Sequence, residues 1–137
     1  MGGMNFEAIS DIVEAKVMGD RVEWQKINYS KSHETMKGRQ CASSVAYCSK
    51  IYTFGGCFMF SPKRMVRECT NQVLVYDIEN SYLSVLKTKG LTAIPRKNHI
   101  SIMYGKSMLV YGGQQENGSL MNEMLVLHLD YNEWSKL

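Results

Sequence analysis

The sequence predicts an all-β fold made of repeated four-stranded antiparallel units, and three observations lead to this expectation. Paired glycines recur at Gly2-Gly3, Gly55-Gly56 and Gly112-Gly113, at intervals of 53 and 57 residues. The segments before the second and third pairs align with each other, and so do the segments after them. A period near 50 residues is typical of proteins that stack four-stranded sheets side by side.

The first half of each unit is predicted to be a β-hairpin. Residues 44–54 (SVAYCSKIYTF) align with residues 101–111 (SIMYGKSMLVY), and in both a short polar turn separates two apolar stretches. Arg39 and Arg96 each stand 16 residues before the first glycine of the pair that follows. Alternating apolar runs around such a turn predict two antiparallel strands that end at Gly-Gly.

The second half of each unit is predicted to be a strand, a turn and another strand. Residues 71–86 align with residues 122–137, and the turns fall at 79–80 and 130–132, where Asp and Asn tolerate tight backbone angles.

The N-terminal segment matches this second half alone. Trp24 lies 21 residues after Gly3, and Trp134 lies 21 residues after Gly113. The equal spacing predicts two outer strands, 12–17 and 22–27, with a turn at Gly19-Asp20. An amphipathic helix over residues 6–18 is the alternative.

The aligned units resemble kelch repeats. The third unit carries the resemblance at Pro95-Arg96, His99, 108–113 (MLVYGG), Asn122 and Trp134. The second unit keeps Tyr76-Asp77 but has Gly38, Ala42 and Leu83 in place of the proline, histidine and tryptophan. The resemblance implies a partial kelch-type β-propeller of about two and a half four-stranded antiparallel blades.

We divide the chain accordingly. Residues 1–27 form the C-terminal half of a blade, 28–38 a linker, 39–88 a kelch repeat, 89–94 a second linker and 95–137 a further kelch repeat. Such propellers close into rings, and closure hides their sheet edges. We therefore expect a fragment of a longer protein. A chain that completes its ring with another polypeptide, or that packs within a large assembly, is the alternative.

The signature residues have physical roles in this scheme. Glycine pairs at 55–56 and 112–113 permit sharp turns and close approach of neighbouring blades. Trp24 and Trp134 are expected to cover the gaps between blades, and His99 to be a polar partner near the inner end of its blade. Arg39 and Arg96 are expected to bind loop carbonyls or a carboxylate of a neighbouring blade. Contact with a partner protein is the alternative for these arginines.

The segment 57–70 is the candidate partner-binding loop. It is six residues longer than its counterparts, and loops on a rigid β scaffold often bind ligands. It joins an apolar group to a basic group, which together suit an acidic, partly apolar protein surface. The residues are Phe58, Met59, Phe60, Lys63, Arg64 and Arg67. In the alternative reading, residues 58–60 continue a strand or pack on a neighbour and the bases are simply solvated.

Composition and motifs favour a binding protein over an enzyme. The net charge of +3 is too small and scattered for nucleic-acid binding, and neither a membrane-spanning run nor a signal peptide is evident. Four cysteines, at 41, 48, 57 and 69, lack paired metal-binding spacing and are expected to be reduced thiols. Phosphate-binding, nucleophile-elbow and zinc-protease motifs are absent, so we expect no catalytic residue, cofactor or metal.

We therefore expect a non-catalytic, cytoplasmic protein-interaction scaffold. Resemblance to kelch domains implies a ubiquitin-ligase substrate adaptor or a component of a cytoskeletal or ciliary complex. A small-molecule-binding or enzymatic propeller that uses a central channel is one alternative, for which Arg39, Arg96 and His99 are the polar residues at the inner ends of strands. A purely architectural subunit is the other.

Overall fold

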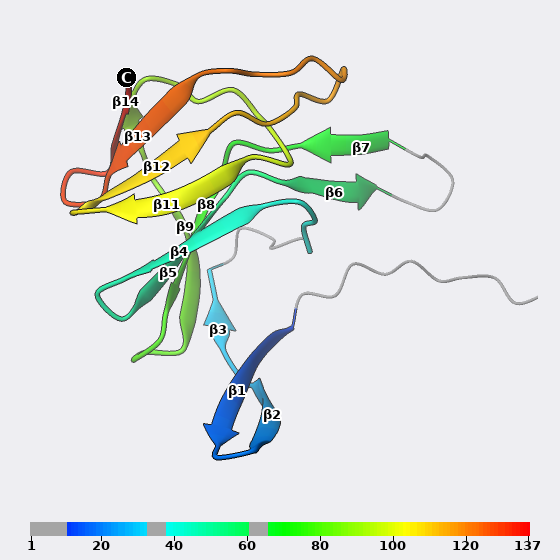
Figure 1. Cartoon of the computed structure of the whole chain (residues 1–137), viewed down its shortest axis with the longest axis vertical. Coiled ribbons are helices and arrows are strands. Elements are labelled where there is room, and N and C mark those ends of the chain that lie inside the picture. Colours follow the sequence, from blue (N-terminus) through cyan, green and yellow to red (C-terminus); the bar gives the residue numbers. More distant parts are fainter. Residues whose placement is uncertain (1–10, 33–37, 61–65) are drawn as a thin grey trace, which may run out of the picture.

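The computed structural model of the chain describes residues 11–32, 38–60 and 66–137. Within these ranges the strands form two five-stranded sheets and two two-stranded sheets (Figure 1). No helix in the described part of the chain has the length and apolarity needed to cross a bilayer. The all-β fold class is confirmed.

The second repeat forms a sheet that we call the middle blade. Its antiparallel strands are β4 (Ser43–Tyr47), β5 (Lys50–Phe54), β8 (Val73–Asp77) and β9 (Tyr82–Leu86), arranged in the order β9-β8-β5-β4. A short fifth strand, β3 (Ser30–Lys31), runs parallel to β9 along its outer edge. The two halves of the repeat therefore pair as the alignment predicts.

The third repeat forms the C-terminal blade with the same topology. Its antiparallel strands are β11 (Ile100–Tyr104), β12 (Ser107–Tyr111), β13 (Met124–His128) and β14 (Glu133–Lys136). Strand β10 (Lys89–Gly90) runs parallel to β14 at the outer edge. Each blade thus has five strands where four were expected, because the segments predicted as linkers pair with backbone groups that an outer strand would otherwise leave free.

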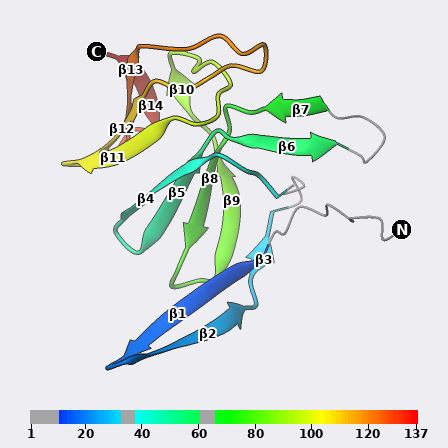
Figure 2. The ribbon, with the colours of Figure 1, turned by 45° about the vertical axis from the view of Figure 1, so that its right-hand side comes forward.

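The N-terminal hairpin consists of β1 (Ile12–Met18) and β2 (Arg21–Ile27). The turn between them lies at Gly19-Asp20, and Gly19 has a φ of 66°, which glycine adopts at little cost. The two predicted strands are confirmed, each one residue longer than expected, and the helical alternative is wrong. In Figure 2 the hairpin lies beside the middle blade and away from the C-terminal blade.

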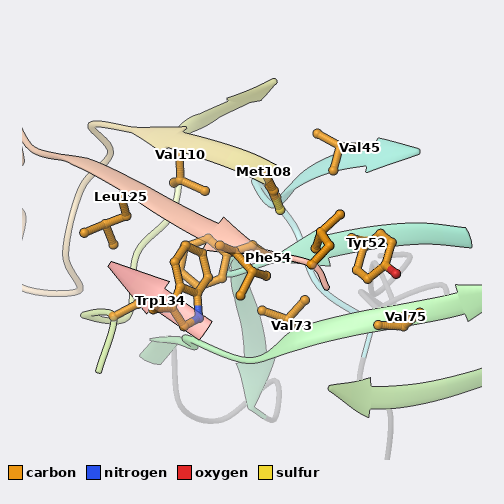
Figure 3. Packing of buried hydrophobic residues seen from close by; sticks show 12 residues of the cluster. Val45, Tyr52, Phe54, Val73, Val75, Met108, Val110, Leu125 and Trp134 are labelled. Atoms are coloured by element: carbon orange, nitrogen blue, oxygen red, sulfur yellow. The ribbon is translucent and has the colours of Figure 1, made fainter. Parts of the chain in front are cut away.

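The main hydrophobic core lies between the middle and C-terminal blades (Figure 3). One face of the middle blade contributes residues of β4, β5 and β8, and the opposing face of the C-terminal blade contributes residues of β12, β13 and β14. Trp134 is 3% exposed, and its ring lies 4.9 Å from that of Phe54 across the interface. The buried members are Val45, Tyr52, Phe54, Val73, Val75, Ala93, Met108, Val110, Leu125, Leu127, Leu129 and Trp134.

The glycine pair of the middle blade allows this close approach. Gly55 has a φ of 64°, and a Cβ added there would lie 2.7 Å from the carbonyl oxygen of Arg96 in the next blade. The same Cβ would lie 2.8 Å from Cε1 of His99. Both distances are too short for real contacts, so Gly55 makes room for the neighbouring blade as predicted.

A second core cluster joins the N-terminal hairpin to the other face of the middle blade. Leu74, Tyr76 and Leu83 are buried there, and Ile12 and Ile27 pack against them. Trp24 takes no part in this cluster because its side chain belongs to the opposite face of the hairpin. It is 72% exposed. Within the described chain Trp24 covers no gap between blades, and its expected role stays a prediction, whereas Trp134 does cover such a gap.

Candidate interaction site

The candidate loop is a β-hairpin with its own two-stranded sheet. Strand β6 (Cys57–Phe60) pairs antiparallel with β7 (Val66–Cys69), and Cys57 lies opposite Cys69 at the base. Both Figure 1 and Figure 2 show the hairpin projecting beyond the two blades. Residues 58–60 therefore continue as strand, which agrees with the alternative reading of this segment.

The structure describes only part of the predicted contact set on this hairpin. Phe58 is partly exposed and pairs through its backbone with Glu68. Lys63 and Arg64 lie outside the described residues, as do the side chains of Met59, Phe60 and Arg67. The partner-binding role of these residues stays a prediction.

Backbone hydrogen bonds anchor the base of the hairpin to the middle blade. The Gln40 amide donates to the Cys57 carbonyl at 2.7 Å, and the Cys57 amide donates back at 2.9 Å. The Thr70 amide donates to the Gly56 carbonyl at 3.0 Å. Arg39 and Phe58 are the chain neighbours of the bridged residues Gln40 and Cys57, so two predicted contact residues come from adjoining backbone positions.

The structure joins none of the cysteines of its described residues in a disulfide. Cys57 and Cys69 at this base are buried, and Cys41 and Cys48 are exposed. Burial raises the pKa of the Cys69 thiol, and the neighbouring Cys57 raises it further. Among the described residues, no group of three or more His, Cys, Asp and Glu side chains could hold a metal ion.

Within the described residues, no carboxylate forms an ion pair with the positive charge of Arg39. Its guanidinium donates to the carbonyl oxygens of Gly55 and Gln72, both at 3.3 Å, and to the side-chain oxygen of Gln72 at 2.9 Å. All three acceptors are neutral. Burial lowers the Arg39 pKa to about 10, so the group stays protonated at neutral pH.

Arg96 occupies the equivalent position in the C-terminal blade but is fully buried, with 0% exposure. It donates to the carbonyl oxygens of Ile94 and Gly112, both at 3.1 Å, and to Oε1 of Glu123 at 2.6 Å. Lys136 also contacts Glu123, at 3.0 Å. This burial removes Arg96 from the candidate contact surface and gives it the structural role, because every acceptor belongs to its own blade.

The carboxylate partner of Arg96 was not predicted from the sequence. The hydrogen bond from Arg96 is the main reason that the pKa of Glu123 is lowered, and Lys136 adds to the effect. The signal was present in the alignment, because Asn122-Glu123 stands opposite Asn71-Gln72. At this repeat position one unit has a carboxylate and the other has an amide. That difference indicates that the two arginines have different surroundings.

His99 packs against the preceding blade and is buried, with 6% exposure. Its ring lies edge-on to Phe54, with ring centres 5.1 Å apart. Burial and, to a lesser degree, the positive charge of Arg96 lower the His99 pKa to about 4, while the Phe54 backbone opposes this weakly. His99 is therefore a neutral packing residue, and the polar role expected for it is wrong. A central-channel site loses two of its three named polar residues, because Arg96 and His99 are both buried.

Tyr76 and Asp77 also serve the blade itself. Tyr76 is buried and meets Tyr29 edge-on, with ring centres 6.3 Å apart. Asp77 accepts a hydrogen bond from the Asn80 amide at 3.0 Å, and this bond is the main reason that its pKa is lowered. Asp77 therefore holds the turn between β8 and β9, while Tyr76 packs in the second core cluster.

Comparison with known proteins agrees with this geometry. The family model described as the KLHDC2/KLHL20/DRC7 kelch-repeats domain matches residues 1–137. A solved structure, titled Structure of YjhT, matches with a TM-score of 0.73 at 13% identity, over 93% of this chain and 44% of that chain. The low identity limits that likeness to the fold.

Curated relatives match over shorter stretches. Acyl-CoA-binding domain-containing protein 4 of Arabidopsis thaliana is 30% identical over 69% of this chain. A tRNA wybutosine-synthesizing protein 2/3/4 of Oryza sativa subsp. japonica is 32% identical over 71% of it. The matches span 13% and 9% of those proteins, so the repeat forms a small part of two otherwise different proteins. Because the family model matches residues 1–137 and the blades have the topology that the repeats predict, the chain belongs to the kelch-repeat family.

Proposed function

We propose that the chain is a non-catalytic protein-interaction module of a larger protein or assembly, with the β6–β7 hairpin as its contact element. Kelch-repeat domains are typically protein-interaction modules. The observation that carries the proposal is the projection of this hairpin from a rigid blade that secures its base through paired backbone hydrogen bonds (Figure 2).

The chemistry around the base supports the same surface. The positive charge of Arg39 meets only neutral acceptors within the described residues, and Phe58, whose chain neighbour Cys57 bridges Gln40, is partly exposed. With the bases Lys63, Arg64 and Arg67 in the same segment, the partner it suits is an acidic protein surface with some apolar area.

At the finer level we propose a role as the substrate-receptor part of a ubiquitin-ligase adaptor or as a scaffold in a cytoskeletal or ciliary complex, in the cytoplasm. We further propose that the partner is neither a nucleic acid nor a membrane, because the net charge of +3 over 137 residues is small. Recovery of cullin components would support the first role, and recovery of tubulin-associated proteins the second.

A pull-down from cells tests the contact element. The test variant reverses the charge of the hairpin bases (Lys63→Glu, Arg64→Glu and Arg67→Glu). The matched control reverses three lysines on other strands and linkers (Lys16→Glu, Lys31→Glu and Lys87→Glu). We expect the hairpin variant to lose partners that the control retains. An unchanged set of partners would show that the hairpin is not the contact element.

A further inference from the structure

Exposed apolar faces lie at both ends of the described chain. The N-terminal hairpin exposes what we call the hairpin face, made of Val13, Ala15, Val17 and Trp24. The C-terminal blade exposes what we call the β11–β13 face, made of Ile100, Ile102, Leu109, Tyr111 and Met124, which lines a hollow of about 240 Å³. Ile102 is 58% exposed and Tyr111 is 47% exposed.

The β11–β13 face repeats the face by which the middle blade packs on its neighbour. In the middle blade Phe54 pairs with Val73, and in the C-terminal blade Tyr111 pairs with Met124. In the same way Val45 pairs with Tyr52, and Ile102 pairs with Leu109. The middle-blade members of these pairs are buried in the core, so the C-terminal members stand at positions that the fold uses for blade packing.

The hairpin face repeats the opposite half of that interface. Ala15 pairs with Trp24 in the hairpin, as Leu127 pairs with Trp134 in the C-terminal blade. Val13 and Val17 lie two residues on either side of Ala15, and Leu125 and Leu129 lie two residues on either side of Leu127. All four residues of the C-terminal blade are buried against the middle blade.

We propose that the hairpin face of one copy of this chain docks on the β11–β13 face of a second copy. The two faces are equivalent in register to the two halves of the interface within the chain, so Trp24 of one copy packs on Tyr111 of the other as Trp134 packs on Phe54. The contact is head-to-tail, because it joins two different surfaces.

The size of a complete propeller makes a second copy the fitting occupant. The chain covers 44% of the solved YjhT chain, so two copies account for most of such a ring. Each copy supplies both halves of the contact, and a second copy can cover either exposed apolar face. Large exposed apolar patches of this kind are uncommon on isolated domains and mark interaction sites.

Sedimentation of the purified chain over a range of concentrations tests the association. We expect the mass to rise with concentration, and Trp24 emission to shift to shorter wavelength as its ring leaves water. Trp24→Ala and Tyr111→Ala are each expected to weaken association about tenfold or more, as central aromatic anchors do. Leu120→Ala, at an exposed loop position that is not among the residues of either face, is the matched control and is expected to associate as the parent does.

Mixing the two variants distinguishes a head-to-tail contact from other forms of association. Trp24→Ala keeps an intact β11–β13 face, and Tyr111→Ala keeps an intact hairpin face. We therefore expect a 1:1 complex of the two that does not grow further. Ile102→Glu provides a second variant of the β11–β13 face in case Tyr111→Ala does not fold, which circular dichroism would show.

Three results would overturn the proposal. The first is a chain that stays monomeric at every accessible concentration, which would leave these faces to blades of another polypeptide. The second is an association that Trp24→Ala and the β11–β13 variants leave unchanged. The third is a failure of the mixed variants to form the 1:1 complex.

Discussion

The middle and C-terminal blades place an arginine at the same repeat position but give it different hydrogen-bond partners. Arg96 is fully buried and pairs with Glu123 at 2.6 Å, whereas Arg39 is less buried and donates to Gln72 at 2.9 Å. The two arginines share one geometry, since each also donates to the carbonyl of the first glycine of its pair, Gly55 or Gly112. The backbone role is thus common to the repeats, and the carboxylate accompanies complete burial.

The blades differ in their neighbours as well. The face of the middle blade that contains Phe54 is covered by the C-terminal blade, while the equivalent face with Tyr111 is exposed. Gly55 touches the next blade, but an added Cβ at Gly112 would meet only Met121 of its own blade, at 3.3 Å. The comparison therefore separates what a kelch repeat needs for its own fold from what it needs to receive a neighbour.

The largest expected effect separates the two glycine pairs. Gly55→Ala and Gly112→Ala both place alanine at positive φ, which costs about 1 kcal/mol. Gly55→Ala also collides with Arg96 and His99, which adds about 3 kcal/mol. Urea unfolding at low protein concentration is expected to show a loss near 4 kcal/mol for the first and near 1 kcal/mol for the second. Equal losses would contradict the close approach of the blades.

The next effect concerns His99, which stands where the middle blade has Ala42. Because the folded pKa is about 4 and the unfolded value is about 6.5, the unfolded chain binds more protons between these values. Stability is therefore expected to fall as the pH drops from 6.5 to 4, by about 3 kcal/mol from this group. His99→Phe keeps an aromatic ring and removes the titration, so its stability is expected to fall less over the same range. Parallel pH profiles would show that His99 is not held neutral.

Glu123→Gln gives the C-terminal blade the arrangement of the middle blade. It leaves the buried Arg96 charge without a carboxylate while keeping one hydrogen-bond acceptor. We expect a loss of about 2 kcal/mol in unfolding free energy. Lys136→Met removes the exposed partner of the same carboxylate and is expected to cost less than about 1 kcal/mol. A similar cost for both variants would mean that burial of Arg96 does not require the carboxylate.

Gln72→Glu makes the reverse change and is expected to have the smallest effect. A carboxylate opposite the partly exposed Arg39 is expected to stabilise the fold by less than about 1 kcal/mol. The gain is expected to shrink at high salt, because ions screen a pair that solvent reaches. Thermal unfolding at low and high salt measures both changes. Destabilisation at low salt would show that the Arg39 site does not tolerate a negative charge.

The repeat alignment located the strands of both blades because each strand has a local apolar pattern and each turn has its own residue types. It also placed Gly55 correctly at the contact between blades. The N-terminal strands followed from the spacing of Trp24 alone, and the structure confirms them. Each of these features is determined by residues that lie close to it in the sequence.

The misses depend on contacts between distant segments. Strands β3 and β10 have two residues each and form through pairing with an outer strand, which composition does not reveal. Trp24 is exposed because a tryptophan covers a gap only where another blade supplies the facing surface. The burial of Arg96 and His99 likewise depends on the fit between two blades, and the roles of Lys63, Arg64 and Arg67 remain predictions.

The two short parallel strands have a consequence for how this chain meets other chains. Each one covers part of the outer edge of its blade. Without it, β9 or β14 would expose unpaired backbone groups with which a strand of another chain could pair. At the inner edge, β4 and β11 lie next to each other, and the hydroxyls of Ser43 and Ser101 share a hydrogen bond between them. Cutting the chain just after Gly90 would therefore separate the C-terminal blade from the strand that covers its outer edge, whereas a cut between Leu86 and Lys89 keeps β10 with the blade that follows it.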